Sequence, residues 1–170
     1  MRLFVSVGTD HHPFDRLVGW ADRWAADHPE DEVVIQFGTS TAPRFGRGVH
    51  LLDPETMRVE FASADVVMIS CGPGGVMDAR AAGRIPVAVA RRHELGEHVD
   101  DHQLAFAELL VEQDLSRAAA SESEFRALVE AVADGREDLS IEPGTDQVPA
   151  GIARIGELID GLVWGTDPLR

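Results

Sequence analysis

The feature that most constrains the fold of this chain is an alternation of short apolar runs with segments of helical spacing. The runs are four to seven residues long and are bounded by glycine or polar residues, which is the pattern of buried strands. They cover residues 3–7, 33–37, 49–52, 64–70 and 85–90. Near-continuous apolar strands separated by helices indicate a parallel sheet covered on both faces. The sequence therefore predicts an α/β fold built on a doubly wound, Rossmann-like parallel sheet.

Segments with apolar residues at helical spacing lie between and after these runs. The predicted helices span residues 14–26, a segment starting at Asp53-Pro54-Glu55, an alanine-rich segment ending at Gly83, 99–113, 122–133 and 151–164. Residues 134–149 are polar and punctuated by glycine and proline, so we expect a surface connection there. A chain of 170 residues is long enough for one sizeable core, and we expect a single domain over residues 1–170.

The last predicted helix carries an apolar stripe. The stripe consists of Ile152, Ile155, Leu158, Ile159, Leu162 and Val163. It packs either onto the core of this domain or onto another chain, which is a different subunit or a second copy. The sequence leaves these alternatives open.

The net charge of the chain disfavours some classes of binding partner. Thirty acidic residues against fifteen basic ones give a formal charge of −15, which repels nucleic acid and anionic membrane surfaces. No apolar stretch approaches the roughly 18 residues that a membrane-spanning helix needs, and the single cysteine, Cys71, cannot form an internal disulfide. We expect a cytoplasmic protein with no nucleic-acid partner and no direct membrane insertion. Any bound phosphate must be held by backbone donors or by single basic side chains.

The central motif is the glycine-rich segment 70–78, where a predicted strand ends and a predicted helix begins. Glycine lets the backbone approach a ligand closely, and the free N–H groups of a helix N-terminus suit a diphosphate. Asp78 is expected in the first turn of that helix, where a carboxylate can accept hydrogen bonds from a ribose. The competing interpretation is that these glycines only form a tight turn between the strand and the helix. The G-x-G-x-x-G, P-loop and G-x-S-x-G motifs are absent from the chain, which disfavours binding of NAD, P-loop nucleotide binding and a serine nucleophile.

Two histidine-containing segments follow the ends of predicted strands, where ligands bind in doubly wound sheets. In residues 7–15, His12 is a candidate for contact with a phosphate or a leaving group. In residues 93–103, the pair His102-Gln103 suits recognition of sugar hydroxyls. His98 and His102 at helical i, i+4 spacing are alternatively part of a zinc site, as in a metal-dependent hydrolase. Neither H-E-x-x-H nor a cysteine pair is present, so we expect no metal and no cofactor.

Taken together, several ordered blocks resemble the C-terminal domain of family 28 glycosyltransferases. The blocks are Val7-Gly8-Thr9 with Phe14-Asp15-Arg16-Leu17-Val18, Gln36-Phe37-Gly38, Ala64-Asp65, residues 72–79, Gly83-Arg84-Ile85-Pro86-Val87 and residues 97–103. The resemblance runs over about residues 2–113. The architecture is most similar to the short catalytic subunits of two-chain enzymes that transfer N-acetylglucosamine to a lipid-linked acceptor.

This resemblance implies one half of a GT-B enzyme that binds a nucleotide diphosphate sugar, usually a UDP-sugar, for metal-independent inverting transfer. The other half, a membrane-anchored partner subunit, would bind the acceptor and bring this chain to the inner face of the membrane. Carried over by position, His102 and Gln103 face the donor sugar, and His12 is the candidate catalytic residue. The residues expected to contact the nucleotide and its diphosphate are Gly8, Thr9, Ser70, Gly72, Gly74, Gly75 and Asp78.

The chain departs from the family pattern at one point. Relatives commonly carry a histidine followed by glycine where this chain has Ser70 and Cys71. Two hypotheses follow: a transferase subunit that is completed by a partner, and a non-catalytic sensor or scaffold that binds the nucleotide sugar without turnover.

Overall fold

The computed structural model describes residues 1–143, so the helix predicted over residues 151–164 lies outside the described residues. The strands are β1 (Arg2–Ser6), β2 (Glu32–Gln36), β3 (Arg47–Val49), β4 (Val66–Ser70), β5 (Val87–Val89) and β6 (Arg117–Ala118). The helices are α1 (Asp15–Asp27), α2 (Pro54–Ser63), α3 (Pro73–Ala81), the 3-10 turn η1 (His93–Leu95), α4 (His102–Glu112) and α5 (Glu122–Ala133). Within this described range, no helix is both long and apolar enough to cross a membrane.

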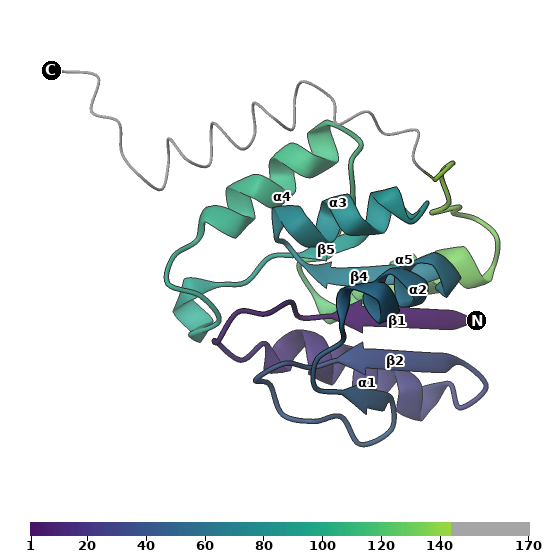
Figure 1. Cartoon of the computed structure of the whole chain (residues 1–170), viewed down its shortest axis with the longest axis horizontal. Coiled ribbons are helices and arrows are strands. Elements are labelled where there is room, and N and C mark those ends of the chain that lie inside the picture. The colour runs from purple at the N-terminus through teal and green to yellow at the C-terminus, as the bar shows by residue number, and fades with distance from the viewer. Residues whose placement is uncertain (144–170) are drawn as a thin grey trace, which may run out of the picture.

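All six strands run parallel in one sheet, in the order β3-β2-β1-β4-β5-β6. The central strand β1 pairs on both sides, so that Leu3 lies opposite Val33 of β2 and Val66 of β4. The arrowheads in Figure 1 all point the same way, and the loops after β1, β4 and β5 gather at that edge. The chain winds outward from β1 in one direction and from β4 in the other, which places a topological switch point between these two strands. The predicted doubly wound fold is confirmed.

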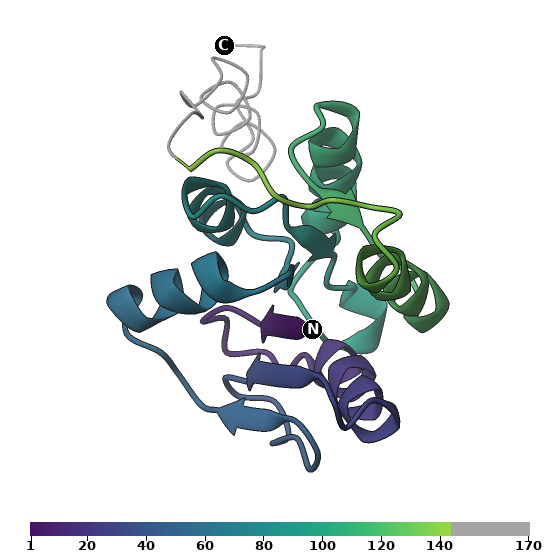
Figure 2. The ribbon, with the colours of Figure 1, turned by 90° about the vertical axis from the view of Figure 1, so that its right-hand side faces the viewer.

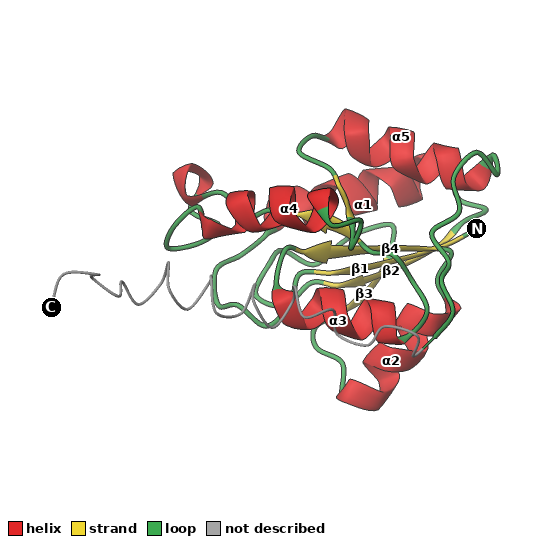
Figure 3. Cartoon of the chain, turned by 90° about the horizontal axis from the view of Figure 1, so that it is seen from above, coloured by secondary structure: helices red, strands yellow, loops and turns green. Residues whose placement is uncertain are grey.

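Helices cover both faces of the sheet because the buried strands are apolar on both faces. Alternate residues of β1 divide between two cores: Leu3 and Val5 pack with α1 and α5, whereas Phe4 packs with α2, α3 and α4. Figure 2 shows α1 and α5 on one side of the strands and α2 and α3 on the other, and Figure 3 shows the same division from above.

Most predicted elements lie within two residues of the observed ones, but one strand and one helix are displaced further and one strand was missed. The strand predicted over 49–52 is β3 at Arg47–Val49, because its position is set by pairing with β2 at the sheet edge, while Leu51 is 52% exposed. The helix predicted from residue 99 begins at His102 as α4. The strand β6 was not predicted, because two residues paired with β5 carry no periodic signal.

Candidate functional site

A cavity of about 380 Å³ opens at the switch point, beyond the carboxyl ends of β1 and β4. It is lined by Ser6, Val7, Gly8, Thr9, Asp10, Ile69, Ser70, Gly72, Gly74, Gly75, Arg91 and Gln103. Seven of the predicted site residues therefore meet in one place, although they come from three segments that are far apart in the chain. The structure brings together Gly8, Thr9, Ser70, Gly72, Gly74, Gly75 and Gln103.

The N-terminus of α3 forms one wall of this cavity. Its N-cap residue, Gly72, has no side chain and provides no capping hydrogen bond to the first amides of the helix. The amides in the first turn of a helix have no acceptor within the helix, and they lie at the positive end of the helix dipole. A Cβ atom at Gly72 or at Gly74 would meet no heavy atom within 4 Å. The protein's own packing therefore does not require these glycines, and the space beside the amides is open to a ligand.

The loop after β1 forms the opposite wall, and its conformation depends on Gly8. The φ of Gly8 is +77°, which favours glycine, and a Cβ atom there would lie 3.1 Å from the Ser70 Oγ. The buried Gln36 fixes this loop, because its Nε2 donates to the carbonyl of Gly8 at 3.1 Å while its Oε1 accepts from the Ser6 Oγ at 2.6 Å. The loop is thus held close to the end of β4 with the hydroxyl of Ser70 facing it.

Arg91, at the carboxyl end of β5, is a site residue that the sequence analysis missed. Its guanidinium is fully buried and donates to the carbonyls of Val7 and His12 at 2.8 Å and of Glu97 at 2.9 Å. Burial lowers the pKa of Arg91, an effect that the nearby carboxylates of Asp10 and Glu97 oppose. The side chain therefore fastens the loop after β1 to the loop after β5. Its place directly after a predicted buried strand is the signal that could have identified it.

The two histidine segments meet beside the cavity, although neither His12 nor His102 lines it. Asp10, which does line it, accepts from the backbone N–H of His12 and contacts the His12 Nδ1, both at 2.7 Å. Burial raises the pKa of Asp10. The hydrogen bonds from His12 and the charges of Arg91 and His98 lower it by more, so the pKa lies below its ordinary value. The orientation of His12 by a carboxylate leaves its Nε2 as the nitrogen that can contact a ligand.

Asp78 does not lie where the sequence analysis placed it. It is the sixth residue of α3, beyond the first turn, and it lines a different hollow of about 350 Å³ between α2 and α3. The prediction that Asp78 lies in the first turn is wrong, because the helix begins at Pro73, directly after the strand end. The i, i+4 helical pairing of His98 and His102 is wrong as well, because α4 begins only at His102.

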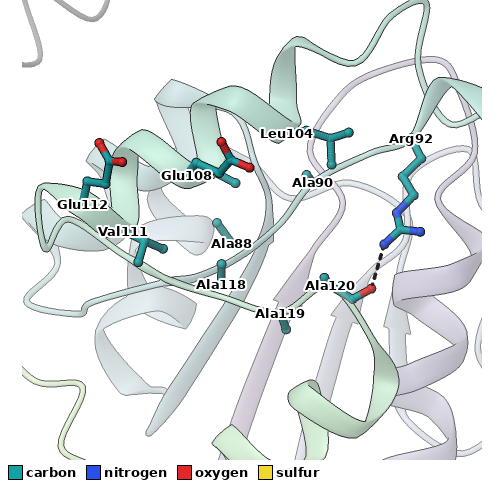
Figure 4. A pocket seen from close by; sticks show the side chains of 11 residues that line it. Ala88, Ala90, Arg92, Leu104, Glu108, Val111, Glu112, Ala118, Ala119 and Ala120 are labelled. Atoms are coloured by element: carbon teal, nitrogen blue, oxygen red, sulfur yellow. Dashed lines mark hydrogen bonds between the residues drawn. The ribbon is translucent and has the colours of Figure 1, made fainter.

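A further cavity, of about 420 Å³, lies between α4 and the strands β5 and β6. Figure 4 shows that alanines line most of it, while Leu104, Glu108, Val111 and Glu112 project from α4, with Glu112 at the end opposite Arg92. At the other end, the guanidinium of Arg92 donates to the carbonyl of Ala120 at 3.1 Å. Hydrogen-bond donors do not converge in this apolar space, so the cavity at the switch point is the better candidate for the functional site.

Comparison with solved structures supports the architecture. The glycosyltransferase of kitacinnamycin matches with a TM-score of 0.55 and 21% identity, over 96% of this chain and 39% of that chain. CalG4, the calicheamicin glycosyltransferase, matches with a TM-score of 0.57 and 20% identity, over 95% of this chain and 44% of that chain. No protein-family model and no curated protein matches the sequence.

The chain has the fold of one Rossmann-like half of a GT-B glycosyltransferase. It spans about two fifths of the length of the two enzymes that it matches. At these identities the likeness establishes the fold, and the family 28 resemblance remains a prediction from the sequence.

Proposed function

We propose that this chain is the donor-binding half of a glycosyltransferase and that it binds a nucleotide diphosphate sugar, specifically a UDP-sugar. The observation that carries the proposal is the uncapped, glycine-lined N-terminus of α3 opening into the cavity at the switch point. In doubly wound sheets this is the position at which nucleotides bind. The two solved structures compared above are glycosyltransferases, which favours this donor class over other nucleotides.

The chemistry of the cavity suits a diphosphate that acts as a leaving group. Negative charge grows on the diphosphate as the sugar departs, and fixed amide dipoles stabilise that charge without reorganisation. The N–H groups of Gly74 and Gly75 supply such dipoles, and the hydroxyls of Thr9 and Ser70 add donors on the facing walls. Arg91 acts indirectly, because its guanidinium already donates to three carbonyls that hold the loops in place. Because the chain carries a net charge of −15, an anion must be held by local donors such as these.

The remaining parts of the donor are assigned by position. Gln103 is buried at the cavity wall, with its Oε1 accepting from the N–H of Arg91 at 3.1 Å, which leaves its amide nitrogen to contact a sugar hydroxyl. His102 precedes it and is proposed to contact the same sugar. His12, oriented by Asp10, is proposed to contact the leaving phosphate through its Nε2. Asp78, one turn further along α3, is proposed to receive the ribose of a nucleotide that extends from the cavity along this helix.

A partner subunit is proposed to supply the acceptor half. The cavity opens at the carboxyl edge of a single sheet, where a second half could face it. The family 28 resemblance favours a membrane-anchored partner and a lipid-linked or polysaccharide acceptor. In that case the partner brings this chain to the membrane.

Calorimetric titration with UDP, GDP and dTDP and with their common sugar conjugates, in the presence of a chelator, tests the proposal. We expect selective, saturable binding of UDP and of one UDP-sugar. Absence of binding both to the isolated chain and to the chain co-expressed with a candidate acceptor-binding subunit contradicts the proposal. The non-catalytic alternative rests on Ser70 and Cys71, and it predicts donor binding without sugar transfer even when that subunit is present.

A further inference from the structure

The loop between β5 and α4, together with the first residue of α4, gathers two histidines and a carboxylate, of which only His102 is also assigned to the proposed donor site. The Nδ1 of His98 lies 3.5 Å from the Oδ1 of Asp100, and the Nδ1 of His102 contacts the same oxygen. One possible ligand atom from each of these three residues lies within 4.8 Å of those from the other two. Imidazole nitrogen and carboxylate oxygen are ligands that zinc and related divalent ions accept.

The two ring nitrogens of His98 have different surroundings. Its Nε2 faces the Oδ2 of Asp10 at 3.4 Å, across the gap between two loops. Its Nδ1 is buried and forms no hydrogen bond with any of residues 1–143, although the Oδ1 of Asp100 lies 3.5 Å away. The side chain as a whole is only 13% exposed. A buried nitrogen without a partner is costly, so its environment requires an explanation.

Metal-binding histidines show this same division of roles. A histidine that binds a metal through one nitrogen almost always donates the other N–H to a carboxylate, a backbone carbonyl or a water, which fixes the tautomer and the direction of the ring. Asp10 occupies the position of that carboxylate, and the free Nδ1 of His98 points toward Asp100 and His102. The rings of His98 and His102 meet edge to face with their centroids 4.7 Å apart, which allows both to approach one ion.

We propose that His98, Asp100 and His102 form a binding site for a divalent transition-metal ion, with Zn²⁺ as the best match. Two nitrogens and one oxygen leave a coordination position open, as in catalytic rather than structural zinc sites. Gln103, next to His102, lines the cavity at the switch point, so the ion would lie at the border of that cavity. The proposal departs from the metal-free site expected from the sequence. It does not depend on the proposed glycosyltransferase function, since the ligands belong to this chain alone.

The test uses the untagged full chain, stripped with a chelator and dialysed. Zn²⁺ is titrated by calorimetry, and Co²⁺ by its visible absorption, which reports the coordination geometry. We expect saturable binding of both ions and its loss in His98→Ala, His102→Ala and Asp100→Asn. The Asp100 side chain is 52% exposed, so Asp100→Asn leaves the fold intact and keeps the test valid if a histidine variant unfolds. Asp10→Asn, which weakens the support behind His98, is expected to lower the affinity about 10- to 100-fold.

His28→Ala is the matched control, because this histidine stacks on Trp24 far along the chain from the proposed ligands. It is expected to bind as the unmodified chain does. Absence of Zn²⁺ and Co²⁺ binding overturns the proposal. Binding that persists in Asp100→Asn and in both histidine variants overturns it too, because the ion would then be held elsewhere. Nucleotide binding is measured separately in chelator, so that failure of the metal site and failure of the donor site are distinguishable.

Discussion

The helices α2 and α3 begin in nearly the same way and differ in one side chain. Each starts with a proline that follows an extended N-cap residue, Asp53 for α2 and Gly72 for α3. Asp53 accepts from the N–H groups of Glu55 and Thr56, both at 3.0 Å. Gly72 offers no acceptor. The first amides of α2 are therefore hydrogen-bonded by a side chain of this protein, whereas those of α3 have no side-chain acceptor at the N-cap and can bind a ligand.

Among the described helices, α1 and α4 also lack a side-chain cap, but the N-cap of α3 is the glycine that lines the cavity. α5 is capped as well, by Ser121, which accepts from the N–H of Glu124. Both capped helices start away from the switch point, and α3 starts directly at it. A side-chain cap stabilises a helix and also fills the space that an anion would occupy. The uncapped N-terminus of α3 beside the cavity therefore leaves room for a diphosphate.

The largest expected effect comes from giving α3 the cap of α2. Gly72→Asp places a carboxylate on the free amides, where it competes with a diphosphate and repels it. The backbone of Gly72 is extended, and a Cβ atom meets nothing within 4 Å, so the variant is expected to fold with unchanged or higher thermal stability. Calorimetry with UDP is expected to show a loss of about 3 kcal/mol, or roughly 100-fold in affinity.

Gly72→Ala is the control for Gly72→Asp, because it adds a Cβ atom without charge and is expected to weaken binding less. Gly19→Ala, on α1, is expected to leave affinity unchanged. If Gly72→Asp binds UDP as the unmodified chain does, the amides of α3 are not the diphosphate site and the comparison with α2 loses its functional meaning.

The second prediction tests whether the middle of α3, at Asp78, and its first amides bind different parts of the nucleotide. Asp78→Ala removes the carboxylate proposed for the ribose and leaves the first amides unchanged. We expect UDP affinity to fall by about 1–3 kcal/mol while the affinity for inorganic pyrophosphate, which has no ribose, stays the same. An equal loss for both ligands in calorimetry would place Asp78 in diphosphate binding, and no loss for either would remove it from the site.

The third prediction concerns stability. Asp53→Ala removes the cap of α2, including the hydrogen bond that the hydroxyl of Thr56 donates to Asp53. We expect the Tm to fall by on the order of 2–4 °C in differential scanning calorimetry, with UDP affinity unchanged. Glu55→Ala, which removes a neighbouring carboxylate that does not cap the helix, is the control. A large drop in UDP affinity with Asp53→Ala would mean that the two helix starts are not separate in function.

The smallest effect is the pH dependence of the same cap. Hydrogen bonds from the side chain and then the backbone N–H of Thr56 lower the pKa of Asp53 in the folded chain. A lowered pKa contributes stability that is complete above the unfolded value, about 3.9, and is lost as the pH falls through the folded value. We therefore expect the difference in Tm between Asp53→Ala and the unmodified chain to shrink as the pH falls below about 4. A difference that persists far below this pH would show that the cap does not act through its charge.

Much of the fold is encoded locally and was predicted from the sequence. The helix at residues 122–133 agrees at both ends, because Ser121 marks its start and its apolar residues repeat along one face. The strand at residues 33–37 is displaced by only one residue. The glycine-rich turn was placed correctly, since a buried strand followed by glycine and proline predicts a strand-to-helix connection wherever it occurs.

The composition of the site was predicted only in part. Glycines and hydroxyls at strand ends were identified because parallel strands end at a common edge, whichever order they take in the sheet. Arg91 was missed because its role depends on carbonyls of Val7 and His12, which are distant in sequence. Asp78 was assigned to the wrong turn because a motif gives spacing along the chain and not the residue at which a helix begins.

The sequence by itself determined the α/β class, the main helices and strands and the loops that carry the site, because these follow from periodicities of a few residues. Only the tertiary structure decided the order of the strands, the two-residue strand β6 and the meeting of Asp10 with His98 across two loops. These features depend on contacts between segments far apart in the chain, which local patterns do not encode. Hydrogen bonds and close packing between such segments form only when the whole sheet is assembled.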